Sequence, residues 1–318
     1  MRLIVLTTEF TKAPPEYVTV SVDDHGIIQV SGSDTESFLQ GQFTCDLAQL
    51  SENDWLFGAH CDNKGKALSV FRILRYRDGV LIVTSKPSLE ASLNQLQKYG
   101  VFNKVEIRDA TADFQLVGVF GTAAPARLAE LLDTPLRTPD SNSVSHCEDA
   151  EVLSLGTHPD QYLCLNRGES LPTNSDLRYW QALEIERGRP TLFSGTIQEF
   201  VPQMLNVQAL NGISFSKGCY IGQETVARMK YLGKQKRALF RLSGHGKQVS
   251  TGATVEQQLG ENWRRAGTVI NAVNRADQHL DVLAVLPSDI ESTTPLRIKD
   301  DDASLLEIYP LPYQLDES

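Results

Sequence analysis

The sequence predicts an α+β fold that ends in a small β-barrel. Strand and helix patterns occur in two rounds in the first part of the chain, whereas residues from 237 onward show only short strands and turns, which fit a barrel or a sandwich. The length of 318 residues suits two or three compact parts. We therefore expect residues 1–236 to form two α+β subdomains, roughly 1–110 and 111–236, and residues 237–318 to form the barrel.

The first round begins with a predicted hairpin. Val18, Val20 and Val22 alternate with polar residues, which is the pattern of a half-buried strand. A polar turn at 23–26 should then return the chain as a second strand over 27–30.

A helix and further strands complete the first round. Ser33 to Glu36 has the pattern of a capping box, which predicts a short helix that ends near Gly41. Apolar runs predict three more strands, and leucines at helical spacing predict one more helix. The three strands are expected at 55–61, 67–76 and 80–84, and the helix is expected at 89–100.

The second round repeats this pattern more weakly. Residues 134–149 are polar and contain two prolines, which predicts a loop. Trp180 lies in a predicted helix, in an apolar stripe with Leu177 and Leu183 that ends before Gly188. The strands of this round are expected at 116–120, 152–155 and 162–165, its helices at 123–132 and 175–186, and the barrel strands at 238–242, 266–273, 280–286 and 296–298.

Composition excludes several classes of protein. The net charge of -10 opposes contact of the whole surface with nucleic acid, so RNA contact would require a local basic patch. Five widely spaced cysteines without a CxxC pair favour a reducing compartment. We find no stretch long enough to span a bilayer and no signal-peptide core, so we expect a soluble, cytoplasmic protein without membrane association.

The residues around Cys219 have features of a reactive site. Gly218 and Gly222 permit a tight turn with exposed backbone N–H groups, and Lys217 would favour the thiolate. Glu224 acts in the opposite sense, so the net effect stays open. From the chemistry alone, a structural role is the stronger interpretation, with Cys219 packed as a small buried hydrophobe.

Several motifs together point to one family. The densest is the octet at 217–224, followed by 226–228 and 236–239; Gly41-Gln42, 60–66 and, more weakly, 261–265 extend the pattern over nearly the whole chain. These segments resemble the YgfZ family. The signature residues of the octet are Lys217, Gly218, Cys219, Tyr220, Gly222, Gln223 and Glu224.

The resemblance implies a fold and a function. The family shares the three-part, ring-like fold of the T-protein, the folate-dependent aminomethyltransferase of glycine cleavage. Its members are described as tetrahydrofolate-binding proteins that support tRNA modification and iron–sulfur enzyme maintenance through one essential cysteine, here Cys219. Two alternatives stay open: a folate-dependent one-carbon transferase or thiol enzyme that uses Cys219, and a non-catalytic module that recruits a tRNA-modifying enzyme.

The resemblance also implies three folate contacts. Trp180 matches a folate-contacting tryptophan, Glu186 matches the acidic residue that binds the pterin in the T-protein, and His25 stands where a close relative has a second tryptophan. An indole offers a flat pterin a stacking face, and a carboxylate suits its paired donors. From the residues alone, Trp180 would be a core residue and Glu186 an ordinary charge at a helix end.

One departure from the T-protein concerns its reaction. The T-protein carries paired aspartates shortly after a Gly-Gly turn, and one of them positions the amine. The matching stretch here, 65–70, contains no carboxylate. We therefore do not expect this chain to perform aminomethyl transfer.

A basic run follows the octet on an otherwise acidic protein. It fits a solvated linker, and it also fits a surface for the glutamates of a folate tail or for tRNA phosphates. The run consists of Arg228, Lys230, Lys234, Lys236 and Arg237.

We expect no metal site. His60 and Cys61 are adjacent, and adjacent side chains on a strand point to opposite faces. A CxxC or HExxH motif that would supply more ligands does not occur, and neither does a cysteine quartet for an iron–sulfur cluster.

Overall fold

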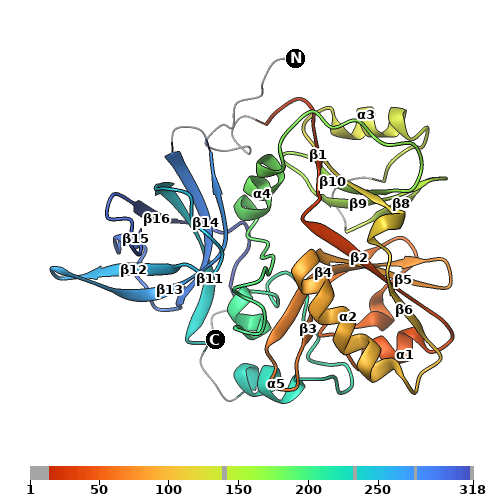
Figure 1. The fold of residues 1–318 in the computed structure, drawn as a ribbon, viewed down its shortest axis with the longest axis horizontal. Coiled ribbons are helices and arrows are strands. Elements are labelled where there is room, and N and C mark those ends of the chain that lie inside the picture. The colour runs from red at the N-terminus through yellow and green to blue at the C-terminus, as the bar shows by residue number, and fades with distance from the viewer. Residues whose placement is uncertain (1–13, 138–141, 232–234, 276–277, 316–318) are drawn as a thin grey trace. The chain divides into compact units, whose positions relative to one another are not determined.

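The computed structural model describes residues 14–137, 142–231, 235–275 and 278–315 (Figure 1). The chain divides into two compact units. The first comprises Met1–Gly41, Asp46–Phe57 and Phe71–Trp180, and the second comprises Gln42–Cys45, Gly58–Val70 and Gln181–Ser318. Two short segments from the first quarter of the chain thus belong with the C-terminal unit.

The first unit contains a five-stranded sheet in the order β1-β7-β10-β9-β8. Helix α3 (Ala124–Leu131) packs on it, and the shared core includes Val119, Leu128 and Tyr162. Neighbouring strands of this sheet pair antiparallel. The strands are β1 (Val18–Ser21), β7 (Gln115–Phe120), β8 (Val144–His146), β9 (Ala150–Gly156) and β10 (Gln161–Asn166).

A second five-stranded sheet has the order β3-β4-β5-β2-β6, and its strands β3 and β4 continue into the second unit. Helix α2 (Lys86–Gly100) lies along the sheet and buries Leu89 and Leu96 (Figure 1). The strands are β2 (His25–Ser31), β3 (Trp55–Cys61), β4 (Ala67–Tyr76), β5 (Gly79–Ser85) and β6 (Glu106–Asp109); short helices are α1 (Thr35–Gln40), η1 (Leu47–Gln49) and η2 (Thr111–Asp113).

The predicted hairpin at the start of the chain is wrong. The two strands exist, but they belong to different sheets: Val18 of β1 pairs with Phe120 of β7, whereas Ile28 of β2 pairs with Ile82 of β5. Turn-forming residues predict where the chain changes direction. They do not predict which strands the segments before and after the turn will pair with.

Two local predictions also need correction. Helix α1 forms as expected, but the side chain of its N-cap, Asp34, makes no capping bond, and Asp34 Oδ2 instead accepts a hydrogen bond from the Lys104 amide at 2.8 Å. The predicted loop at 134–149 contains strand β8, which is short and partly polar and therefore gave little signal; residues 138–141 of that loop lie outside the described part of the chain.

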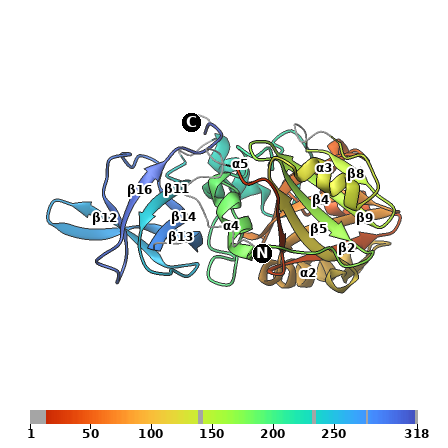
Figure 2. The same ribbon diagram turned by 90° about the horizontal axis from the view of Figure 1, so that it is seen from above.

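The second unit contains a closed barrel, in the strand order β11-β14-β13-β12-β15-β16 (Figure 2). Its interior is filled by buried aliphatic side chains such as Leu242, Val282 and Leu306. Two of its strands, β12 and β16, were not predicted. The strands are β11 (Arg237–His245), β12 (Thr254–Leu259), β13 (Asn262–Asn274), β14 (His279–Pro287), β15 (Leu296–Ile298) and β16 (Leu305–Tyr309).

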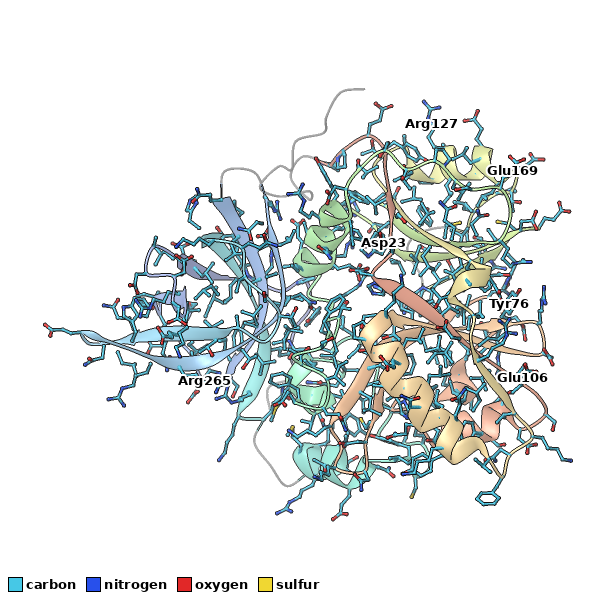
Figure 3. The ribbon with its side chains drawn as sticks, viewed as in Figure 1. Asp23, Tyr76, Glu106, Arg127, Glu169 and Arg265 are labelled. Atoms are coloured by element: carbon cyan, nitrogen blue, oxygen red, sulfur yellow. The ribbon has the colours of Figure 1, made fainter. Side chains whose placement is uncertain are left out.

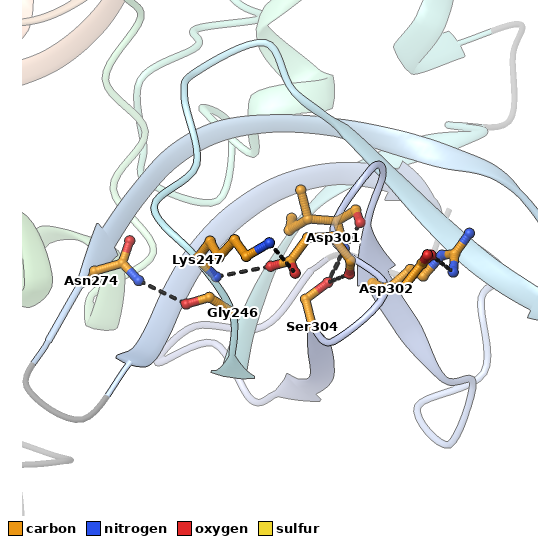
Figure 4. Close-up of polar contacts among 8 residues, drawn as sticks. Gly246, Lys247, Asn274, Asp301, Asp302 and Ser304 are labelled. Carbon is orange, nitrogen blue, oxygen red and sulfur yellow. Dashed lines mark hydrogen bonds and ion pairs between the residues drawn. The ribbon is translucent and has the colours of Figure 1, made fainter.

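Polar contacts join the loops of the barrel. Asp301 Oδ2 accepts from the Lys247 amide at 2.9 Å, and the Asp301 carbonyl accepts from the Ser304 hydroxyl at 2.7 Å (Figure 4). Asn274 donates to the Gly246 carbonyl at 3.0 Å. These bonds satisfy backbone groups that lie beyond the ends of the strands. Arg265, on the β12–β13 hairpin, is exposed (Figure 3).

The helices of the second unit lie in the chain between the sheets and the barrel. Helix α4 (Leu177–Glu186) begins in the first unit, whereas η3 (Pro202–Leu205) and α5 (Gln223–Tyr231) lie wholly in the second. The barrel starts at Arg237, and we keep the domain boundary near residue 236 as a proposal. None of the helices in the described ranges combines the length and the apolarity that a membrane crossing requires.

Candidate functional site

Cys219 lies in the loop that leads into α5, and its side chain is exposed. This exposure shows that Cys219 is not packed as a buried hydrophobe. The other four cysteines differ, since Cys45, Cys61 and Cys164 are buried and Cys147 is half-buried. Cys219 is therefore the thiol most open to a reaction partner.

Two glycines fix the position of this loop. Gly222 has a φ of +83°, and a Cβ at this position would lie 2.6 Å from the Asp62 carbonyl oxygen. Gly65 has a φ of +76°, and a Cβ there would lie 2.9 Å from the Gly222 carbonyl oxygen and 2.7 Å from Thr225 Cβ. Neither position has room for a side chain, and both need the left-handed conformation that favours glycine. The octet and the turn at 62–65 are thus in backbone contact.

The turn that receives Gly222 is itself held by Asp62. The Asp62 carboxylate accepts hydrogen bonds from the amides of Lys64 and Lys66, each at 2.9 Å, and from the Gln198 side chain at 3.2 Å. The Lys66 ammonium donates to the Glu199 carbonyl at 2.8 Å. The carboxylate therefore has a structural role, because it fixes the turn against which the octet packs.

Lys217 holds the other end of the octet. Its Nζ donates to the carbonyl oxygens of Phe43 at 2.9 Å and Cys45 at 2.7 Å, and it lies 5.3 Å from the centre of the Tyr220 ring. The ammonium thus ties the loop to the segment 42–45. The effect of Lys217 on the Cys219 thiolate stays a prediction.

Three buried titratable groups near this loop, Tyr220, Cys61 and His60, are neutral at pH 7. Burial raises the pKa of Tyr220 and of Cys61, and the neighbouring Asp62 adds to the rise for Cys61. Burial lowers the pKa of His60 to about 3, and the His60 ring lies edge-on to Phe43 at 5.3 Å. Cys61 is therefore a protonated, unreactive thiol, in contrast to the accessible Cys219.

Trp180 is a buried residue at the start of α4. It exposes 2% of its surface, and its indole ring lies so close to Gly118 of β7 that a methyl group there would overlap it. This packing is the core role that the helical stripe predicted. A pterin would need neighbouring side chains to move before it stacked on this ring, and the folate contact stays a proposal.

Glu186 is not an ordinary surface charge. It is 4% exposed, and its Oε1 lies 3.8 Å from the guanidinium of Arg241 on β11. A buried carboxylate is costly unless cations or donors surround it. Glu186 is therefore held in the interior of the second unit, beside the guanidinium of Arg241.

His25 begins strand β2, where its Nδ1 lies 2.6 Å from Asp24 Oδ1. The side chain is buried, and the residue pairs across the sheet with Ser85. His25 and Trp180 belong to the first unit, whereas Glu186 and Cys219 belong to the second. The role of His25 as a folate contact stays a prediction.

The basic run divides into parts with different roles. Arg228 and Lys230 are exposed on α5, so this half of the run is helical and does not form a linker. Arg237 donates to the Ala266 carbonyl at 3.0 Å within the barrel. Lys236 is exposed, and Lys234 lies outside the described residues. Within the described ranges, His, Cys, Asp and Glu side chains form no group of three that would hold a metal ion.

Comparison with known proteins identifies the family. Residues 235–301 match the family model described as the YgfZ β-barrel domain. The tRNA-modifying protein YgfZ of Enterobacter sp. (strain 638) is 41% identical over 312 residues, which cover 94% of each chain. The chain belongs to the YgfZ family. A second YgfZ relative, from Yersinia pestis (strain Pestoides F), is 38% identical over 327 residues, or 98% of each chain.

A solved structure shares the fold of this YgfZ-family chain. It is the crystal structure of glycine cleavage system aminomethyltransferase T from Bartonella henselae, with a TM-score of 0.68 over 93% of this chain and 86% of that one. The identity is 14%, so the likeness concerns the fold alone. The predicted T-protein-like α+β fold with a C-terminal barrel is confirmed.

Sequence reasoning found the octet and the 60–66 motif separately and missed their contact. It also missed Asp62 and Gln198 as supports of the turn. A signal was available, because Asp62 followed by Lys64-Gly65 is typical of a side chain that caps a tight turn.

The glycine contact predicts a sharp difference between two substitutions in one loop. Gly222→Ala should lower the free energy of unfolding by about 1–3 kcal/mol and change the rate at which a thiol reagent modifies Cys219, because the octet must move off the turn. Gly218→Ala is the matched control, since a Cβ there has no neighbour within 4 Å among the described residues. Denaturant unfolding and reagent kinetics measure both effects, and equal behaviour of the two variants would contradict the assigned contact.

Proposed function

We propose that this YgfZ-family chain binds tetrahydrofolate or a one-carbon derivative in the cytoplasm, and that it supports tRNA modification and iron–sulfur enzyme maintenance through Cys219. The observation that carries the proposal is an exposed thiol on a loop that is held at both ends. A fixed and accessible cysteine has the geometry that thiol chemistry needs. The relatives named tRNA-modifying protein YgfZ support the role in tRNA modification, and the aminomethyltransferase fold supports the proposed folate binding.

The aminomethyl transfer of the T-protein is not part of this proposal. Residues 67–70, where the T-protein would carry its aspartates, are buried in β4 and have no carboxylate. The nearest acid in the sequence is Asp62, whose carboxylate already accepts hydrogen bonds from Lys64, Lys66 and Gln198. The reaction, if the chain has one, would use the sulfur of Cys219.

The proposed folate contacts are Glu186, for the paired donors of the pterin, and Trp180 and His25, for its ring. The support for Glu186 is its burial beside the Arg241 guanidinium, together with the capacity of a carboxylate to accept several hydrogen bonds. When bound, tetrahydrofolate would supply a carrier of one-carbon groups. The chain itself would orient the pterin and present the thiol.

A cysteine substitution separates the proposal from its two alternatives. Cys219→Ser should abolish the tRNA modification that depends on this protein in cells, while calorimetry still detects tetrahydrofolate binding with unchanged affinity. Cys147→Ser is the control, because that half-buried thiol lies in the first unit. Full modification with Cys219→Ser would refute the role of the thiol and favour the recruiting module, whereas turnover of a folate-bound carbon that requires Cys219 would favour the thiol enzyme.

Glu186 offers a direct test of the pterin site. Glu186→Gln should weaken tetrahydrofolate binding by about tenfold or more, because a hydrogen bond to a charged group contributes roughly 1.5–3 kcal/mol. Glu184→Gln is the matched control, since Glu184 lies on the same helix, is also buried and pairs with Arg189 at 3.1 Å. Titration calorimetry measures both variants, and an equal loss in both would show that Glu186 acts only on stability.

A further inference from the structure

The end of α5 and the loop before the octet together carry an aromatic and cationic cluster that we name the Tyr231 platform. It consists of Phe215, Arg228, Lys230 and Tyr231. Tyr231 exposes 66% of its surface, which is a large exposure for an aromatic residue. Its ring lies edge-on to Phe215, with the two ring centres 6.4 Å apart.

One cation of the platform lies against the Phe215 ring, and a second lies on the same helix as Tyr231. The Lys230 ammonium lies 4.6 Å from the centre of the Phe215 ring, and Arg228 is exposed one helical turn before Tyr231. Glu224 is the acidic residue of α5, and it lies in the opposite, first turn of the helix. The end of the helix therefore combines positive charge with an open aromatic face, on a protein of net charge -10.

We propose that the Tyr231 platform binds single-stranded RNA, with an unpaired base stacked on Tyr231 and flanking phosphates at Arg228 and Lys230. Single-stranded RNA is recognised by base stacking on aromatic side chains together with Lys and Arg contacts to the backbone. Duplex RNA hides its base faces, so an exposed tyrosine gains little from it. The inference rests on the proposed function, for which it names the RNA-contacting surface beside the octet.

Charge complementarity favours RNA over a protein partner. The cores of protein interfaces are depleted of charged residues, lysine among them, whereas here the exposed Arg228 and Lys230 accompany one open ring. The net charge of -10 makes most of the protein surface repel polyanions. The Tyr231 platform would therefore restrict contact to a short segment of the nucleic acid.

The test measures binding of a fluorescently labelled single-stranded RNA of about 12 nucleotides, a length within the range that such grooves cover. Tyr231→Ala should weaken binding roughly tenfold with an unchanged salt dependence, because it removes a stacking face and no charge. Lys230→Ala should instead reduce the slope of log affinity against log salt by about one. A duplex of the same length should bind more weakly than the single strand and lose little with Tyr231→Ala.

The chain offers a matched control in the first unit. Tyr99 is 39% exposed on α2, and the Lys98 ammonium lies 5.5 Å from its ring centre, so this pair has the same chemistry at another place. Tyr99→Ala and Lys98→Ala should leave RNA binding unchanged. An equal loss with Tyr99→Ala, or no loss with Tyr231→Ala in a protein whose circular dichroism and melting temperature are unchanged, would overturn the proposal.

Folate titrations keep this inference separate from the proposed function. Tyr231→Ala should bind tetrahydrofolate as the unaltered chain does, and Cys219→Ser should bind the RNA normally. RNA binding that depends on Tyr231 in a protein without folate affinity would sustain the platform and refute the folate site. A polyglutamated folate whose affinity falls with Lys230→Ala, in a protein that does not bind RNA, would assign the platform to the folate tail and refute the RNA proposal.

Discussion

The backbone contact between Gly65 and Gly222 is the constraint on which the candidate site depends. Each glycine occupies the left-handed region, and each leaves space that the backbone of the other segment fills. Two segments separated by more than 150 residues in the sequence thereby approach to backbone contact. Since Asp62 fixes the turn and Lys217 ties the preceding end of the octet to carbonyl oxygens, Cys219 lies on a loop whose two ends are both fixed.

This arrangement separates the roles of the residues in the octet. Lys217, Tyr220 and Gly222 face protein and hold the loop, while Cys219 and Gly218 face outward. The buried groups around the loop carry no charge at neutral pH, because burial disfavours the ionised forms of Tyr220, Cys61 and His60. A thiol presented by a loop that is fixed at both ends can meet a partner without rearrangement of that loop.

Much of the fold could be predicted from local patterns. The period of two in β1 and the leucine spacing of α2 reflect burial of one face, which is encoded within a few residues. Strand pairing was not predictable, and the expected β1–β2 hairpin failed because the partners of these strands, β7 and β5, lie far away in the sequence. Strand β8 was missed because three partly polar residues give too short a pattern.

The residues of the candidate site could be predicted from the sequence, but the contacts between them could not. Cys219 and the glycines were identified from sequence, yet nothing local shows that Gly222 meets Asp62 or that the Lys217 ammonium turns toward Phe43 and Cys45. From the residues alone Glu186 was an ordinary charge at a helix end, and its burial beside Arg241 depends on the barrel strand β11. Such contacts depend on the tertiary fold and join residues far apart in the sequence, so local sequence patterns do not predict them.

The fold exposes Cys219 and buries the thiols of Cys45, Cys61 and Cys164. The most direct measurement of this difference is a time course of alkylation by iodoacetamide on the native protein, with each modified cysteine identified by peptide mass spectrometry. We expect Cys219 to be modified first and Cys45, Cys61 and Cys164 to react only after unfolding. Modification of Cys61 at the rate of Cys219 under native conditions would contradict this expectation.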